Sequence, residues 1–162
     1  MKVILVDSVA EVTVEISRQL HEHGWALIAT PYEGLLHHYT LGLPRRWNHP
    51  DLESFGLDEE RGAGFITTLV TRIAAGKRYR SGDFISDLVP GFDLFLVENP
   101  IDPAGEPITG GRLRLVWPDA EQRYPWDVDC EARCSCQRFI PPPADISLEA
   151  LQAQLGVLGR IN

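Results

Sequence analysis

Apolar side chains recur at steps of three and four along three stretches of the chain, which is the spacing of one face of an α-helix. The first stretch follows Ser8, which can form a capping box with Glu11, and Gly24 supplies a stop. The second helix is predicted over 58–76 and the third over 147–158. Each predicted helix is amphipathic and therefore needs a partner surface.

Runs of apolar residues bounded by turn residues predict the sheet on which these helices pack. The runs at 25–31 and 35–43 flank a short turn and predict a hairpin. Further strands are predicted at 52–57, 92–98 and 112–117. This order of elements predicts an α+β fold with a largely antiparallel or mixed sheet and amphipathic helices packed on it. The central helix should pack through Phe65, Ile66, Leu69, Val70 and Ile73.

Side-chain alternation within the predicted strand 35–43 separates its two histidines. His37 and Tyr39 fall on the more apolar side, which we expect to face the core. His38 and Thr40 share the other side. Tyr39 should therefore be more buried than Thr40, and His37 and His38 should not bind one metal ion together.

The composition is that of an acidic globular protein, with 162 residues, 44% hydrophobic and 23% charged, and a net charge of −8. This length fits a single domain over 1–162. The charge disfavours non-specific binding to nucleic acid or membranes, since basic residues cluster only weakly, at 45–46 and 77–80. The apolar run at 3–6 is too short for a signal peptide, and an odd number of cysteines argues against a disulfide framework. We therefore expect a cytoplasmic location.

Several separated motifs resemble a known bacterial family. In chain order they are HYTLGLP, HPDLESFGL, a helix ending in AAGK, and RLVWPDAEQRYPWD. Together they extend over roughly 23–128 and resemble the domain of unknown function DUF4262. The resemblance implies a small, stand-alone bacterial domain, and it implies no activity, cofactor or catalytic residue.

All three cysteines, Cys130, Cys134 and Cys136, lie in one segment with C-x3-C-x-C spacing. Zinc sites in proteins use four ligands, usually supplied as close pairs by two segments, and only one such segment exists here. Acidic neighbours also disfavour the thiolate that a metal or a reactive site requires. We therefore expect inert thiols and no metal or other cofactor, with zinc binding or a reactive thiol as alternatives.

Four residues are candidates for acid–base chemistry in a small hydrolase-type enzyme. His38 or His49 would be the base, because imidazole titrates near neutral pH, and Asp119 or Asp127 would orient it or act as the acid. Gly42 would let a ligand approach the backbone beside His38. None of the common nucleotide-binding or hydrolase signatures accompanies them in the sequence.

Aromatic rings alternate with prolines and carboxylates along 117–127, a composition typical of ligand clefts and interfaces, but also of loops that close a sheet. We expect a non-catalytic binding or interaction module that uses this aromatic loop, with the hydrolase as the alternative. Its partner would be a small molecule or a protein, and homo-oligomerisation stays open. The expected contact residues are Tyr39, Thr40, Arg112, Arg114, Trp117, Tyr124 and Trp126.

Overall fold

We describe a computed structural model of the protein, which covers residues 3–5, 9–32, 34–101 and 107–125 together with Asp127, Asp129 and Gln137. The chain divides into two compact units, Met1–Tyr79 and Arg80–Asn162, and each is described by itself. The single domain over 1–162 stays a prediction. Within the described ranges, no helix is long and apolar enough to cross a membrane.

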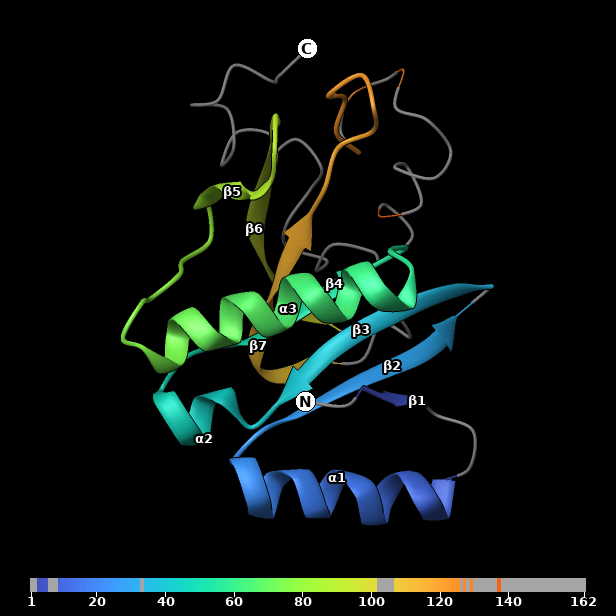
Figure 1. Cartoon of the computed structure of the whole chain (residues 1–162), viewed down its shortest axis with the longest axis vertical. Helices are drawn as coiled ribbons and strands as arrows, with labels where there is room; N and C mark the ends of the chain where they lie inside the picture. Colours follow the sequence, from blue (N-terminus) through green and yellow to red (C-terminus); the bar gives the residue numbers. More distant parts are fainter. Residues whose placement is uncertain are drawn as a thin grey trace. The chain divides into compact units, whose positions relative to one another are not determined.

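Four strands of the first unit lie side by side in chain order: β1 (Ile4–Leu5), β2 (Ala26–Tyr32), β3 (Leu35–Leu41) and β4 (Asp51–Phe55) (Figure 1). β1 pairs parallel with β2, whereas β2 with β3 and β3 with β4 pair antiparallel. The predicted hairpin is confirmed, because Ala26 lies opposite Leu41 and Tyr32 lies opposite Leu35. The predicted α+β class with a mixed sheet is confirmed as well.

The helices of this unit are α1 (Val9–His23), α2 (Leu43–Trp47) and α3 (Glu59–Ala74). Ile16 of α1 packs with Ile28 and Tyr39, so α1 covers one face of the strands. Gly62 of α3 lies against the ring of His38. Because His38 and Tyr39 are neighbours on β3 and point to opposite faces, α3 covers the other face.

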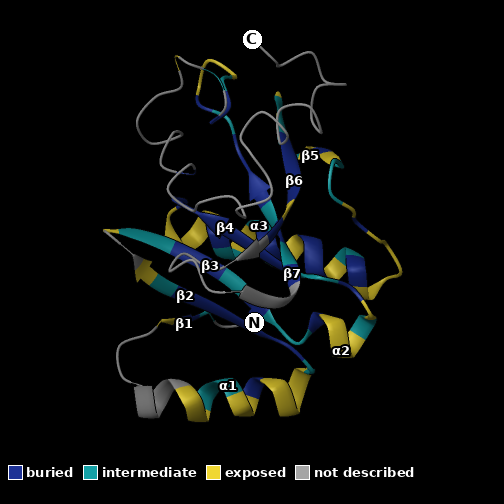
Figure 2. Ribbon diagram, turned by 180° about the vertical axis from the view of Figure 1, so that it is seen from behind, coloured by how far each residue is buried: buried dark blue, intermediate teal, exposed yellow. Residues whose placement is uncertain are grey.

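Helices on both faces leave the middle strands of this unit largely buried (Figure 2). The predicted order of burial is therefore wrong, because Thr40 is fully buried and Tyr39 only partly. The alternation itself is confirmed. The error came from assuming that only one face of the strand meets the core, which holds for a sheet covered on one side.

The helix predicted over 58–76 is confirmed as α3. The Asp58 side chain accepts a hydrogen bond from the Arg61 backbone N–H at 2.7 Å, which caps the first turn. Four of the five predicted apolar residues are buried, and Phe65 is half-buried. The helix predicted after Ser8 is confirmed as α1, although Ser8 itself lies outside the described residues, as does the predicted helix over 147–158.

β3 ends at Leu41, two residues before the predicted strand end. Gly42 adopts a left-handed conformation with φ of 102°, and α2 then begins at Leu43 with Pro44 in its first turn. A Cβ on Gly42 would lie 2.6 Å from the Gly24 carbonyl oxygen. The glycine thus lets two backbone segments approach each other, which corrects the expectation that it opens a path for a ligand.

Three strands of the second unit pair antiparallel in the order β7-β6-β5: β5 (Phe84–Val89), β6 (Phe92–Ile101) and β7 (Pro107–Val116). β6 and β7 confirm the strands predicted at 92–98 and 112–117 and extend beyond them. The sequence did not predict β5, which is mostly exposed and lacks an apolar run, nor the two-residue β1. Phe95, Val97, Val116 and Tyr124 form a core cluster of this unit.

Candidate functional site

A buried pair of titratable side chains lies on the α1 face of the strands. His37 Nε2 lies 2.7 Å from Glu53 Oε2, and both residues are almost fully buried. The His37 ring also stacks on Tyr39, with ring centroids 5.0 Å apart. His37 is thus a hydrogen-bonded structural histidine, as the strand pattern predicted. Glu53 was not singled out from sequence, although a glutamate between Leu52 and Phe55 in a strand signals a buried partner.

His38, the first candidate base, lies fully buried beneath α3. Among the described residues, neither ring nitrogen has a hydrogen-bond partner, and nor does the hydroxyl of Ser54, which lies directly opposite on β4. A Cβ on Gly62 would lie 2.4 Å from the ring, so α3 covers the side that we expected to be open to a ligand. Burial lowers the pKa of His38 below its ordinary 6.5, and the nearby Glu59 backbone offsets this only in part.

Two expected contact residues, Tyr39 and Thr40, contact other residues of the first unit. Tyr39 stacks on the His37 ring, as described above. The Thr40 hydroxyl donates to Asp51 Oδ1 at 2.8 Å and accepts the Leu52 backbone N–H at 2.9 Å. Asp51 Oδ1 also accepts the Leu43 backbone N–H at 3.1 Å, which fixes the start of α2. These bonds hold β3, β4 and α2 together at one end of the strands.

His49, the second candidate base, uses both ring nitrogens to hold backbone. Its Nε2 accepts the Tyr79 backbone N–H at 3.0 Å, so Nδ1 carries the proton and donates to the Pro50 carbonyl at 2.8 Å. Burial lowers the pKa of His49 below 6.5, and the positive charge of Arg78 lowers it further. The neutral ring therefore joins the end of α2 to the segment that follows α3.

The burial of these two neutral histidines predicts a loss of stability in acid. Their pKa values are lower in the folded protein than the ordinary 6.5, so the unfolded chain binds more protons below that pH. The contribution of these two histidines to the free energy of unfolding should be constant above about pH 6.5. It should decrease as the pH falls below that value. Urea denaturation followed by circular dichroism at several pH values measures this. His49→Gln should make the decrease shallower, and an unchanged slope would contradict the prediction.

The two candidate aspartates organise their own loop in the second unit. Asp119 is buried, and its Oδ1 accepts the backbone N–H groups of Glu121 and Arg123, both at 2.9 Å. Its Oδ2 accepts Arg123 Nε at 2.8 Å. Asp127 Oδ2 accepts the Tyr124 backbone N–H at 2.8 Å. Both carboxylates thus act as turn-forming acceptors within their own unit.

The aromatic loop, 117–127, does not present the rings of Trp117 and Tyr124 to solvent. Both residues are buried, and Tyr124 donates its hydroxyl to the Asp93 carbonyl at 2.7 Å. The Trp117 backbone is held through both its N–H and its carbonyl by the Gln137 amide. Neither of these two rings therefore offers an exposed contact surface, while Trp126 lies outside the described residues.

The remaining site candidates are two arginines on β7 and the three cysteines. Arg112 and Arg114 are half-buried on β7, and Arg114 Nη1 donates to the Gln137 carbonyl at 3.4 Å. The cysteines Cys130, Cys134 and Cys136 lie outside the described residues, so the expectation that they bind no metal stays a prediction.

A cluster of cations that sequence reasoning had treated as weak forms one surface of the first unit. We name it the basic corner and define it by Arg45, Arg46, Lys77 and Arg78, all exposed. The bond between His49 and Tyr79 brings its two segments together. Within the described part of the chain, these four residues form no ion pair with a carboxylate.

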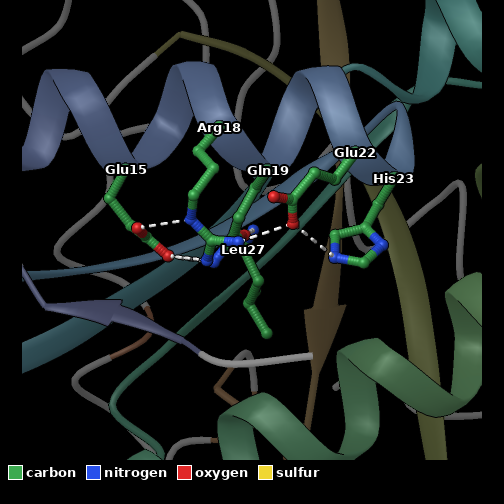
Figure 3. Close-up of polar contacts among 6 residues, drawn as sticks. All are labelled: Glu15, Arg18, Gln19, Glu22, His23 and Leu27. Atoms are coloured by element: carbon green, nitrogen blue, oxygen red, sulfur yellow. Dashed lines mark hydrogen bonds and ion pairs between the residues drawn. The ribbon is translucent and has the colours of Figure 1, made fainter.

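The outer face of α1 shows the opposite arrangement, in which a cation is paired (Figure 3). Arg18 forms ion pairs with Glu15 and Glu22, and His23 lies 3.7 Å from Glu22. A signal for the difference is present in the sequence. No Asp or Glu occurs in 34–50 or in 61–82, the two stretches that supply the basic corner.

A comparison with protein families shows which family this chain resembles. The model of the family described as "Domain of unknown function (DUF4262)" matches residues 19–102, more than half of the 162 residues. The matched range runs from the second half of α1 to the end of β6 and includes the basic corner. No curated protein and no solved structure gives a significant match.

Proposed function

The chain belongs to the DUF4262 family, and within that family we propose that it acts as a non-catalytic binding module. The observation that carries this proposal is the structural use of three of the four acid–base candidates. Both ring nitrogens of His49 form hydrogen bonds with backbone groups. Asp119 and Asp127 accept hydrogen bonds from backbone N–H groups of their own loop. A group held in this way is poorly suited to exchange protons with a substrate.

The surface that best fits a binding role is the basic corner. Its exposed side chains form no ion pair with a carboxylate of the described residues and are available to an acidic ligand, whereas Trp117 and Tyr124 lie in the core. Arg and Trp are also enriched where proteins bind one another, and Trp47 lies beside Arg46 on α2. We therefore propose this surface in place of the aromatic loop.

A screen for hydrolysis tests the non-catalytic part of the proposal. The purified chain is incubated with chromogenic esters, phosphate esters and glycosides, and His38→Asn and Asp119→Asn serve as controls. We expect no turnover above that of the variants. Hydrolysis by the wild-type chain that either substitution abolishes, while the fold is retained, would overturn the proposal.

One observation favours a hydrolase as a second candidate. Ser54 and His38 lie opposite each other on β4 and β3, and their side-chain polar atoms are buried without hydrogen-bond partners in the described part of the chain. A serine hydroxyl that gives its proton to a histidine can attack an ester, with departure of the alcohol and later hydrolysis of the acyl-serine by water. A fluorophosphonate probe would then attach to the Ser54 oxygen with loss of fluoride. Mass spectrometry showing no adduct at Ser54 would eliminate this candidate.

We also propose a cytoplasmic location and a bacterial origin. The odd number of cysteines supports a reducing compartment, because secreted domains of this kind usually pair their thiols. The resemblance of the sequence motifs to a bacterial family supports the origin. The acidic composition is compatible with both proposals.

A further inference from the structure

We propose that the basic corner binds an acidic peptide segment of another protein. The inference rests on the proposed binding function and adds to it the location of the surface and the chemistry of the partner. Its three supporting features are the convergence of cations, their lack of acidic partners, and the small extent of the cluster.

The cations converge because all three helices of the first unit end in the same region. In both Figure 1 and Figure 2, α2 lies beside the last turn of α3. The His49 to Tyr79 bond fixes that arrangement, since it joins the residue after α2 to the segment after α3. Gly24, which follows α1, lies against the Arg46 side chain, because a Cβ there would be 2.7 Å from Arg46 Cδ.

These cations exceed what the helix ends require. The C-terminal end of a helix carries partial negative charge, and nearby cations stabilise it. Arg78 has this role, because its Nη1 donates to the carbonyls of Ile73 and Lys77 at 3.1 and 3.0 Å. Within the described residues, Arg45, Arg46 and Lys77 donate no hydrogen bond to a helix end. Arg46 lies over the Trp47 ring and Lys77 over the Tyr79 ring.

Two acidic side chains on the elements that flank the basic corner are already engaged. Glu22, in the last turn of α1, is paired with Arg18. Asp51, which follows α2, accepts bonds from the Thr40 hydroxyl and the Leu43 N–H. The mutual repulsion of the corner's cations is therefore best relieved by carboxylates from outside the chain, which arginine can bind through two parallel hydrogen bonds.

Charge and extent favour an acidic peptide over a nucleic acid. The chain has a net charge of −8, so a long polyanion that extends past the corner meets repulsion from the rest of the surface. Non-specific nucleic-acid sites also combine extended cationic grooves with free aromatic platforms. The Arg46 guanidinium instead lies over the ring of Trp47, the tryptophan at this corner.

The test uses the full chain and a short fluorescein-labelled peptide of glutamates, with binding followed by fluorescence anisotropy. Arg45→Glu combined with Lys77→Glu reverses two charges of the basic corner. Arg61→Glu combined with Gly64→Glu and Thr68→Glu changes the net charge equally at exposed positions elsewhere in the same unit and is the matched control. Arg45→Gln with Lys77→Gln is a milder variant, and circular dichroism confirms that each variant is folded.

We expect the wild-type chain to bind the peptide, with an affinity that falls as salt is added. The Arg45/Lys77 charge reversal should weaken binding by about tenfold, and the control by less than about twofold. Equal weakening by the control, or tighter binding of an oligothymidine of the same charge than of the peptide, would overturn the inference. So would the absence of peptide binding by the wild-type chain. None of these results depends on the hydrolysis screen, so the two proposals fail separately.

Discussion

Gly62→Ala should destabilise the protein by about 1–3 kcal/mol, although alanine ordinarily stabilises a helix interior. Gly62 lies within α3, and a Cβ there would lie 2.4 Å from Cε1 and Nδ1 of His38. Such a separation is far inside van der Waals contact, and His38 is fully buried and cannot turn into solvent. Either the helix or the ring must shift, and the cost of overpacking exceeds the helical gain.

Gly64→Ala is the matched control for this prediction. Gly64 lies two positions further along the same helix, and a Cβ there would have no atom within 4 Å. It should stabilise the protein by about 0.5–1 kcal/mol. Urea denaturation of both variants measures the difference, and adding His38→Ala to Gly62→Ala should recover part of the loss. Equal effects of the two alanines would show that α3 does not press on His38.

Replacing either partner of the buried pair of His37 and Glu53 should cost about 3–5 kcal/mol. Their side chains meet at 2.7 Å on adjacent strands, and each is almost fully buried. Glu53→Leu leaves the His37 ring without this acceptor, and His37→Phe leaves a buried carboxylate without this donor. A buried polar group that loses its partner bears most of its desolvation cost, which is why these single changes are severe.

The double variant with His37→Phe and Glu53→Leu distinguishes the loss of the interaction between the two side chains from the effect of changed packing. Because both polar groups are removed together, it should be much more stable than the sum of the single changes implies. Denaturation midpoints of the four proteins complete the double-mutant cycle. If the single losses simply add, the two side chains are not coupled and the pair does not contribute as we expect.

Local patterns in the sequence were sufficient for the elements whose signals are themselves local. Asp58 caps α3 as predicted, and its apolar stripe is buried. The hairpin of β2 and β3 follows from two apolar runs on either side of Gly34. α2 was missed because Leu43 continues an apolar run, and only the left-handed backbone at Gly42 ends the strand.

The candidate site was harder to predict, because its contacts join distant parts of the chain. The Glu53 partner of His37 lies 16 positions away, and the Tyr79 donor to His49 lies 30 positions away. Alternation along β3 assigned His37 and His38 to opposite faces but could not show that both faces are covered. Nor does the sequence reveal that the ends of α2 and α3 meet, which is what turns two short basic stretches into one surface.

The parallel pairing of β1 with β2 suggests the order in which the first unit assembles. β2, β3 and β4 follow one another along the chain and pair antiparallel, so short connections can bring them together early. β1 reaches β2 only after the chain has passed through α1, and it then contributes just two residues. We expect β1 to dock last and to open first. Amide hydrogens at its junction with β2 should therefore exchange with solvent well before those inside the hairpin.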